Sequence, residues 1–165
     1  TENGGIWETF DPKDQIQKFN FSNKNTNGLT ADLARMMKIW VNNTSSLEYK
    51  SYYLLQNVIV YLDENYRTGA NYDNYQFVVR DYFEFLQDYG NKGLSNYAGT
   101  ALSRANKAID YYENDKPREA SKEWIKIFGS NGTFPSVPYN PNKKESGTRV
   151  FTNPSAPYGN YSNTR

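Results

Sequence analysis

The chain has 165 residues, and its 19 lysines and arginines against 18 aspartates and glutamates give a formal net charge of +1. This length allows one domain with a hydrophobic core, and the balanced charge gives no global field that would attract nucleic acid or an anionic membrane. Cysteine and histidine are both absent. The composition therefore excludes disulfides, thiol nucleophiles, Cys/His zinc sites and an imidazole general base.

Other features of the composition bear on the setting of the protein. No apolar run is long enough to span a bilayer, so we expect no membrane partner. The absence of cysteine fits a reducing environment, and we expect a cytoplasmic location. Fifteen tyrosines and three tryptophans supply many rings that stack and hydrogen-bond. The chain begins "TENGGIWETFDP" without a methionine, and we expect it to be part of a longer protein.

Helix signals begin at residue 11. Asp11 can cap a helix, and Pro12 suits the first helical position. Ile16 and Phe19 then open an apolar stripe, which the pair Asn27-Gly28 ends. Thr30 is the expected cap of a second helix. The apolar residues of this second helix recur at helical spacing, at Leu33, Met36, Met37, Trp40 and Val41.

Four further helices are expected after the loop "NNTSSLEYK". The segment "SYYLLQNVIVYLDENY", residues 51–66, is apolar on nearly every side, so we expect it to be the central buried helix. Apolar residues at helical spacing predict two more helices, over about 73–88 and 97–114. Pro117 begins a sixth helix that ends at Phe128, with Gly129 placed to terminate it.

The sequence predicts three regions. Residues 1–11 are interpreted as a segment that enters from a missing catalytic lobe, and only "GGIWETF" within it has a strand signal. Residues 12–129 are predicted to form a compact, all-α bundle of about six helices. Residues 130–165 hold five of the seven prolines and almost no aliphatic residues. Such a composition cannot bury enough apolar surface to order itself, so we expect a long flexible tail there.

The hairpin "RMMKIWVNNTSSLEYKSYYLLQ" places unusual polar groups around one turn. Lys38 is expected in the last turn of the second helix, and Ser51 at or next to the start of the third. A loop of fewer than ten residues brings these two ends together. A helix N-terminus attracts anions, and a hydroxyl with an ammonium group would complete a phosphate cradle. The Tyr52 ring could then stack on a base.

A purely structural interpretation of the same residues is also open. Ser51 would be an N-cap, Lys38 would interact with the C-terminus of its own helix, and Tyr52 would fill the core. No complete catalytic constellation is found elsewhere in the sequence. The residues alone leave both interpretations standing.

Several segments together resemble the C-terminal helical lobe of the cGAS/DncV-like nucleotidyltransferases (CD-NTases), relatives of oligoadenylate synthase. "LARMMKIW" is similar to the leucine-arginine-lysine-tryptophan helix of that family, and "KSYYLLQNVIV" to its serine-tyrosine helix. "ALSRANKAIDYYENDKPREASKEWIKIFGSNGTFP" resembles the closing pair of helices in bacterial members. The resemblance covers roughly residues 4–135 and lies in the order and spacing of these segments.

The resemblance implies a role for each hairpin residue. Lys38 and Ser51 match the residues that hold the triphosphate of the donor nucleotide, and Tyr52 matches the aromatic residue that stacks on its base. The family transfers nucleotidyl groups from ATP, GTP or other NTPs with Mg²⁺, and its cyclic or linear oligonucleotide products activate anti-phage effectors in bacteria. Its Gly-Ser turn and metal-binding carboxylates are absent from this chain, so an N-terminal catalytic lobe is the expected partner. The tail is similar to the flexible C-termini of the family, some of which are conjugated to other proteins.

Two other functions compete with half of a nucleotidyltransferase. One is a stand-alone helical interaction module that uses the Tyr/Pro-rich arm as its binding segment. The other is a nucleotide sensor without catalysis. A Gly-Ser turn followed by Asp-x-Asp upstream of Thr1 would identify the enzyme.

Overall fold

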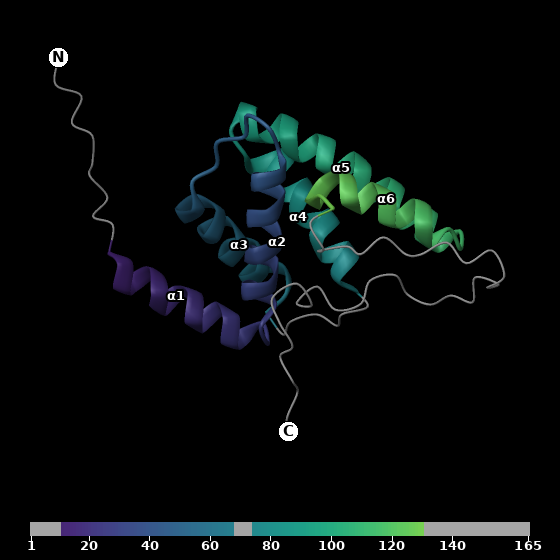
Figure 1. Cartoon of the computed structure of the whole chain (residues 1–165). Coiled ribbons are helices and arrows are strands. Elements are labelled where there is room, and N and C mark those ends of the chain that lie inside the picture. The colour runs from purple at the N-terminus through teal and green to yellow at the C-terminus, as the bar shows by residue number, and fades with distance from the viewer. Residues whose placement is uncertain (1–10, 68–73, 131–165) are drawn as a thin grey trace, which may run out of the picture.

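The computed structural model describes residues 11–67 and 74–130, which form six helices (Figure 1). These helices are α1 (Pro12–Asn25), α2 (Leu29–Asn43), α3 (Ser51–Asn65), α4 (Tyr75–Tyr89), α5 (Lys92–Glu113) and α6 (Pro117–Phe128). Neither described range contains a strand. The prediction of an all-α bundle of about six helices is confirmed. The expected strand in "GGIWETF" and the tail from 131 onward lie outside the described residues.

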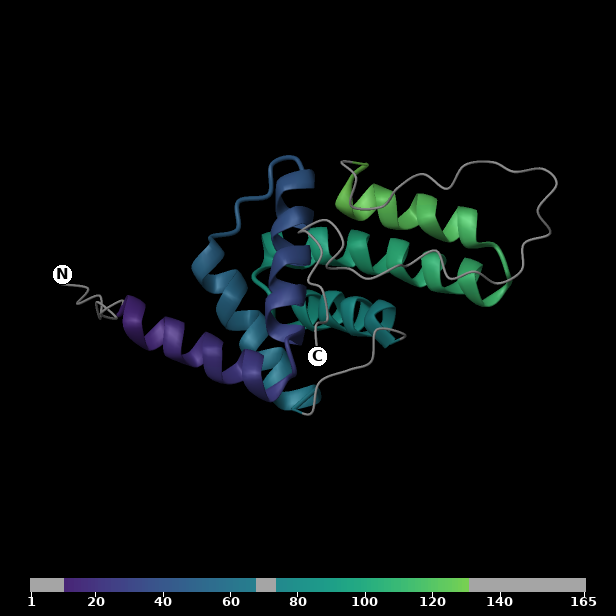
Figure 2. The ribbon, with the colours of Figure 1, turned by 60° about the horizontal axis from the view of Figure 1, so that its bottom comes forward.

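The helices form two groups: α4, α5 and α6 lie side by side, and the group of α1, α2 and α3 packs against them (Figure 2). α5 lies between α4 and α6, and Figure 2 shows these three helices running side by side. α2 packs against both α3 and α6, while α1 lies along the outside of the bundle against α2 and α3. None of the helices within 11–67 and 74–130 combines the length and hydrophobicity needed to cross a bilayer.

Aromatic rings from three helices meet in the core. Phe83 of α4 is fully buried, and its ring meets the edge of the Trp40 ring at a centroid distance of 5.0 Å. On another side Phe83 packs against Phe128, 6.5 Å away, which in turn stacks on Trp124 at 6.1 Å. These rings join α2, α4 and α6 into one hydrophobic cluster.

The prediction that α3 is the central buried helix is wrong. Its outer face leaves Tyr53 54% exposed and Val60 47% exposed. α4 is more fully enclosed, with buried residues spread along its length at Tyr75, Val78, Val79, Tyr82, Phe83 and Leu86. The aromatic and aliphatic content of α3 suggested burial on all sides, but a tyrosine can keep its ring at a surface because its hydroxyl is solvated.

The first helix starts as predicted, and the second does not. The Asp11 carboxylate caps α1 by accepting a hydrogen bond from the Lys13 backbone N–H at 2.9 Å, with Pro12 at the first helical position. α2 is capped by Gly28, at φ 92°, rather than by Thr30. Thr30 lies one residue inside the helix, and its hydroxyl is used in contacts with α1.

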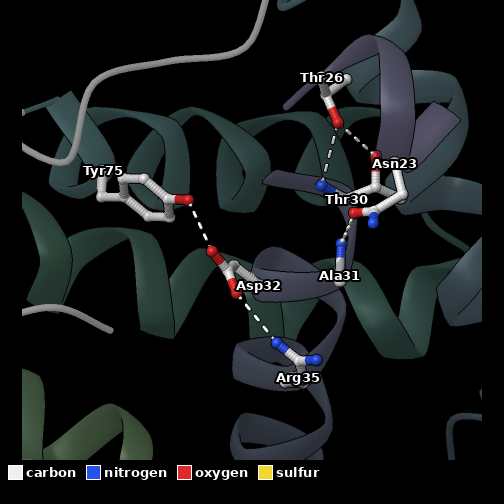
Figure 3. Close-up of polar contacts among 7 residues, drawn as sticks. All are labelled: Asn23, Thr26, Thr30, Ala31, Asp32, Arg35 and Tyr75. Atoms are coloured by element: carbon white, nitrogen blue, oxygen red, sulfur yellow. Dashed lines mark hydrogen bonds and ion pairs between the residues drawn. The ribbon is translucent and has the colours of Figure 1, made fainter. Parts of the chain in front are cut away.

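A buried polar cluster joins α1 to the rest of the bundle. The Ser22 hydroxyl lies 2.9 Å from the Thr30 hydroxyl and donates to the Asp63 carboxylate at 3.0 Å. The Thr26 hydroxyl lies 2.8 Å from the Thr30 hydroxyl, and the Asn23 side-chain oxygen accepts a hydrogen bond from the Ala31 backbone N–H at 2.9 Å (Figure 3). Ser22, Thr26 and Thr30 are all 0% exposed. Hydrogen bonds therefore carry much of the attachment of α1.

The apolar stripe predicted for α1 is not buried in the core. Ile16 is 59% exposed and Phe21 is 67% exposed, while Phe19 is half-buried. Ser22 is the buried residue of this helix. The spacing of apolar residues in this helix therefore did not mark a side that faces the core.

The boundaries of the later helices differ from the predictions by up to five residues. α4 begins at Tyr75, and α5 begins at Lys92 instead of residue 97, because the Asn91 side chain caps it by accepting from the Leu94 backbone N–H at 3.0 Å. α6 spans Pro117–Phe128 as predicted. Gly129 ends it at φ 82°, in the left-handed region that favours glycine.

Gly129→Ala is expected to lower the free energy of unfolding by about 2–3 kcal/mol. A Cβ at this position would lie 2.7 Å from the Asn43 side-chain oxygen, and Asn43 donates to the Ile127 carbonyl at 3.0 Å. Urea unfolding would measure the loss. Gly28→Ala is a control for positive φ alone: nothing lies within 4 Å of the added Cβ, although its ψ of −10° differs from the 173° of Gly129. Equal losses in the two variants would contradict the role assigned to the Asn43 contact.

Candidate functional site

Lys38 lies on α2 at an exposed position, five residues before the helix ends at Asn43. The prediction that it occupies the last turn is wrong. The helix continues because Trp40 is buried in the core, and it ends where the Thr44 hydroxyl donates to the Trp40 carbonyl at 2.7 Å. Lys38 therefore faces α1 and α3 rather than the carbonyl end of its own helix.

Ser51 is the first residue of α3 and is exposed. The connection from α2 is residues 44–50, so the prediction of a short loop and of Ser51 at the helix start is confirmed. The capping position belongs to Lys50, whose side chain makes no capping hydrogen bond. Ser51 is thus not the N-cap of the structural interpretation. The first turn of a helix carries backbone N–H groups without partners inside the helix.

Tyr52 is half-buried and belongs to the α1-facing side of α3. Its hydroxyl accepts a hydrogen bond from the Gln56 side chain at 2.7 Å, and its ring meets the edge of the Tyr53 ring at 5.3 Å. The pKa of Lys18 on α1 is raised, mainly by its hydrogen bond to Asp14 and to a smaller extent by the Tyr52 phenol. The ring consequently does not fill the core, and it lies near α1 at the surface.

A groove of about 300 Å³ opens where α1, α2 and α3 meet. Lys38 lines it together with Arg35, and its apolar wall includes Ile16, Phe19, Ala34 and Leu55. Tyr52 precedes Leu55 by three residues, so the two side chains share one face of α3. The structure therefore brings Lys38 level with the first turns of α3, while Ser51 does not line the groove.

Sequence reasoning did not identify Arg35 as part of this surface. Its guanidinium Nη1 lies 3.0 Å from one Asp32 carboxylate oxygen, and the Tyr75 hydroxyl donates to the other oxygen at 2.8 Å (Figure 3). The Asp32 side chain is only 13% exposed. Tyr75 of α4 thus holds the Asp32 carboxylate, and this carboxylate holds the Arg35 guanidinium. The spacing of three residues between Arg35 and Lys38 is the signal that would have placed both on one helix face.

A second cavity, of about 460 Å³, lies over α4 and α5 and differs in character. Polar side chains line it, including Gln87, Thr100 and Lys107. Arg104 also lines this cavity. Its guanidinium Nη1 lies 3.6 Å from Oε2 of Glu123, so the two side chains form an ion pair. This cavity has no aromatic or large apolar side chain among its lining residues.

The described residues contain no group of three Asp or Glu side chains that could hold a metal ion. Mg²⁺ binds through several oxygen ligands, usually carboxylates together with substrate phosphates. The residues within 11–67 and 74–130 therefore do not fit a catalytic Mg²⁺ site, and no metal-dependent step is assigned to them.

Comparison of the chain with protein-family models, with curated protein sequences and with solved structures finds no match. The resemblance to CD-NTases thus rests on the order of the sequence segments given above.

Proposed function

We propose that the α2–α3 hairpin binds a nucleoside triphosphate, and that the chain is the donor-nucleotide-binding lobe of a CD-NTase-like nucleotidyltransferase. One observation carries the proposal. Lys38 and Ser51 are both exposed on this hairpin, and neither holds the position that the purely structural interpretation requires: Ser51 is not the N-cap of α3, and Lys38 is not in the last turn of α2.

Each residue contributes a different kind of contact to the proposed site. The exposed Lys38 ammonium is a point charge for phosphate oxygens. The Ser51 hydroxyl and the backbone N–H groups of the first turn of α3 add donors, and the helix dipole favours negative charge there. The Tyr52 ring supplies a face on which a base can stack.

The proposal divides the reaction between two lobes. The chemistry of nucleotidyl transfer and the Mg²⁺ ions belong to a separate catalytic lobe, while this chain orients the ATP, GTP or other NTP donor. The products would be cyclic or linear oligonucleotide signals of anti-phage defence, made in the cytoplasm. The resemblance to CD-NTases supports these assignments.

Lys38→Ala and Ser51→Ala are each expected to weaken binding of ATP and GTP by about tenfold, because each removes one contact to phosphate. Tyr52→Ala should weaken binding by at least about fivefold, whereas Tyr52→Phe should retain the affinity because the ring face remains. Titration calorimetry on the 165-residue protein measures the affinities. Thermal melts of the same variants check that each of them is folded.

Lys107→Ala is the matched control for Lys38→Ala. Lys107 is also an exposed lysine that lines a cavity, but it lies on α5 beside the polar cavity. Its removal should leave ATP affinity unchanged. If Lys38→Ala and Lys107→Ala weaken ATP equally, binding is a general effect of positive charge. If stability falls in the Ser51 and Tyr52 variants while affinity holds, the hairpin has only a structural role.

A further inference from the structure

The apolar wall of the α1–α2–α3 groove has no role in the hairpin site described above. Ile16 of α1 is 59% exposed and lines the groove together with Leu55 of α3. A large aliphatic side chain left this open to water gains contact area when a ligand covers it. Ligand sites in proteins are commonly of 300 Å³ or more, mostly apolar, and carry a small number of placed polar groups.

The charges that line the groove point to the chemistry of its ligand. Lys38 and Arg35 both face it, one helical turn apart on α2, and no carboxylate is among its lining residues. Asp32, the partner of Arg35, is held on its other oxygen by Tyr75, which keeps the guanidinium in place. The groove therefore combines an apolar wall with a cationic edge, which suits a molecule that has a flat apolar part and an attached anion.

Tyr52 lies on α3 near this groove but is not among its lining residues. It lies three residues before Leu55 on the same face of α3, and its phenol contributes to the electrostatic environment of Lys18 on α1.

We infer that α1 takes part in binding: its Ile16 and Phe19 form one wall of a subsite for the base of the nucleoside triphosphate, while Lys38 binds the phosphates. This inference rests on the proposed function, since it concerns the same ligand. It assigns to α1 a part in recognition of the base, in addition to the stacking on Tyr52. It also explains why α1 keeps an apolar side chain at a position that does not contribute to the core.

The test separates base from phosphate by using two probes, ATP and inorganic tripolyphosphate. Ile16→Ser should weaken ATP binding by about fivefold, because a polar side chain replaces apolar contact with the base. Affinity for tripolyphosphate should be unchanged in this variant. Ile16→Leu should restore ATP affinity, because it keeps the wall apolar. Lys38→Ala should weaken both probes.

Phe21→Ser is the matched control. Phe21 is an even more exposed apolar residue of the same helix, 67% exposed, and it does not line the groove. Its substitution should change neither affinity. Unchanged ATP binding in Ile16→Ser, or an equal loss for both probes, would overturn the subsite while leaving the phosphate site intact. If the unaltered protein binds neither probe, the proposed function fails, and the subsite fails with it.

Discussion

Phe83→Ala is expected to destabilise the bundle by about 3–5 kcal/mol, because it leaves a cavity among rings that cannot collapse freely. Phe83 is 0% exposed and contacts Trp40 of α2 and Phe128 of α6. Its side chain thus joins three helices, and truncation removes contacts on several sides at once. A loss of this size is a large fraction of the stability of a small domain. Chemical denaturation followed by circular dichroism would measure it.

Two further variants make the Phe83 measurement specific. Tyr89→Ala removes an aromatic ring from the same helix, but this ring is 79% exposed, so its loss should cost about 1 kcal/mol or less. Phe83→Leu keeps most of the volume and should cost about 1–2 kcal/mol. A Phe83→Ala loss no larger than that of Tyr89→Ala would show that the three helices do not share this core.

Alkaline pH is expected to unfold the protein through its buried tyrosines. Burial is the main cause that raises the pKa of Tyr82 well above its ordinary value, and the neighbouring Tyr49 phenol adds to the effect. Burial also raises the pKa of Tyr61, whose hydroxyl donates to the Val78 carbonyl at 3.2 Å. In the unfolded chain both phenols would ionise near pH 10. The folded protein therefore keeps protons that the unfolded chain releases.

The sign of the pH dependence follows from this difference. Below pH 10 the phenols are neutral in both states, and the stability that they contribute is fully present. Above pH 10 only the unfolded state ionises, so the free energy of unfolding falls by about 1.4 kcal/mol per pH unit for each phenol. For Tyr61 and Tyr82 together the loss is about 4 kcal/mol near pH 11.5.

Urea unfolding at several pH values between 9 and 11.5 would measure this loss, with tyrosinate absorbance followed in parallel. Tyr82→Phe should remove the part of the decline that comes from this phenol, about 2 kcal/mol by pH 11.5. The explanation fails if all tyrosines ionise while the helical signal stays intact, or if the variant and the unaltered protein decline equally.

Local sequence signals located the helices well where the cap chemistry is self-contained. Pro117 and Gly129 bracket α6 as expected, because proline suits the first turn and glycine adopts the left-handed terminus. The start of α5 was missed because residues 92–96 include a glycine and a serine, which are weak helix formers, although the Asn91 cap was visible in the sequence. Thr30 was misassigned because its hydroxyl bonds to Ser22 and Thr26, contacts that no local pattern specifies.

The candidate site was predictable only in part for the same reason. A short loop between two helices places Ser51 and Tyr52 near α2 in any hairpin. The extent of α2 beyond Lys38 depended on the burial of Trp40, which is a tertiary contact. The wall that α1 contributes through Ile16 follows from how that helix packs, and apolar spacing alone could not distinguish a groove wall from a core face.

The hydrogen-bonded attachment of α1 has a consequence for how the bundle moves. Hydrogen bonds among buried polar groups hold this helix, from Ser22 and Thr26 to Thr30 of α2 and Asp63 of α3. Ile16 and Phe21 of α1 stay largely outside the core. We therefore expect separation of α1 to expose less apolar area than separation of α4, and denaturants act in proportion to the area exposed. Amide hydrogen exchange in α1 would then depend only weakly on urea, unlike exchange in α4. We expect the wall of the groove to open while the aromatic core stays closed, and a ligand bound there to slow amide exchange first in that one helix.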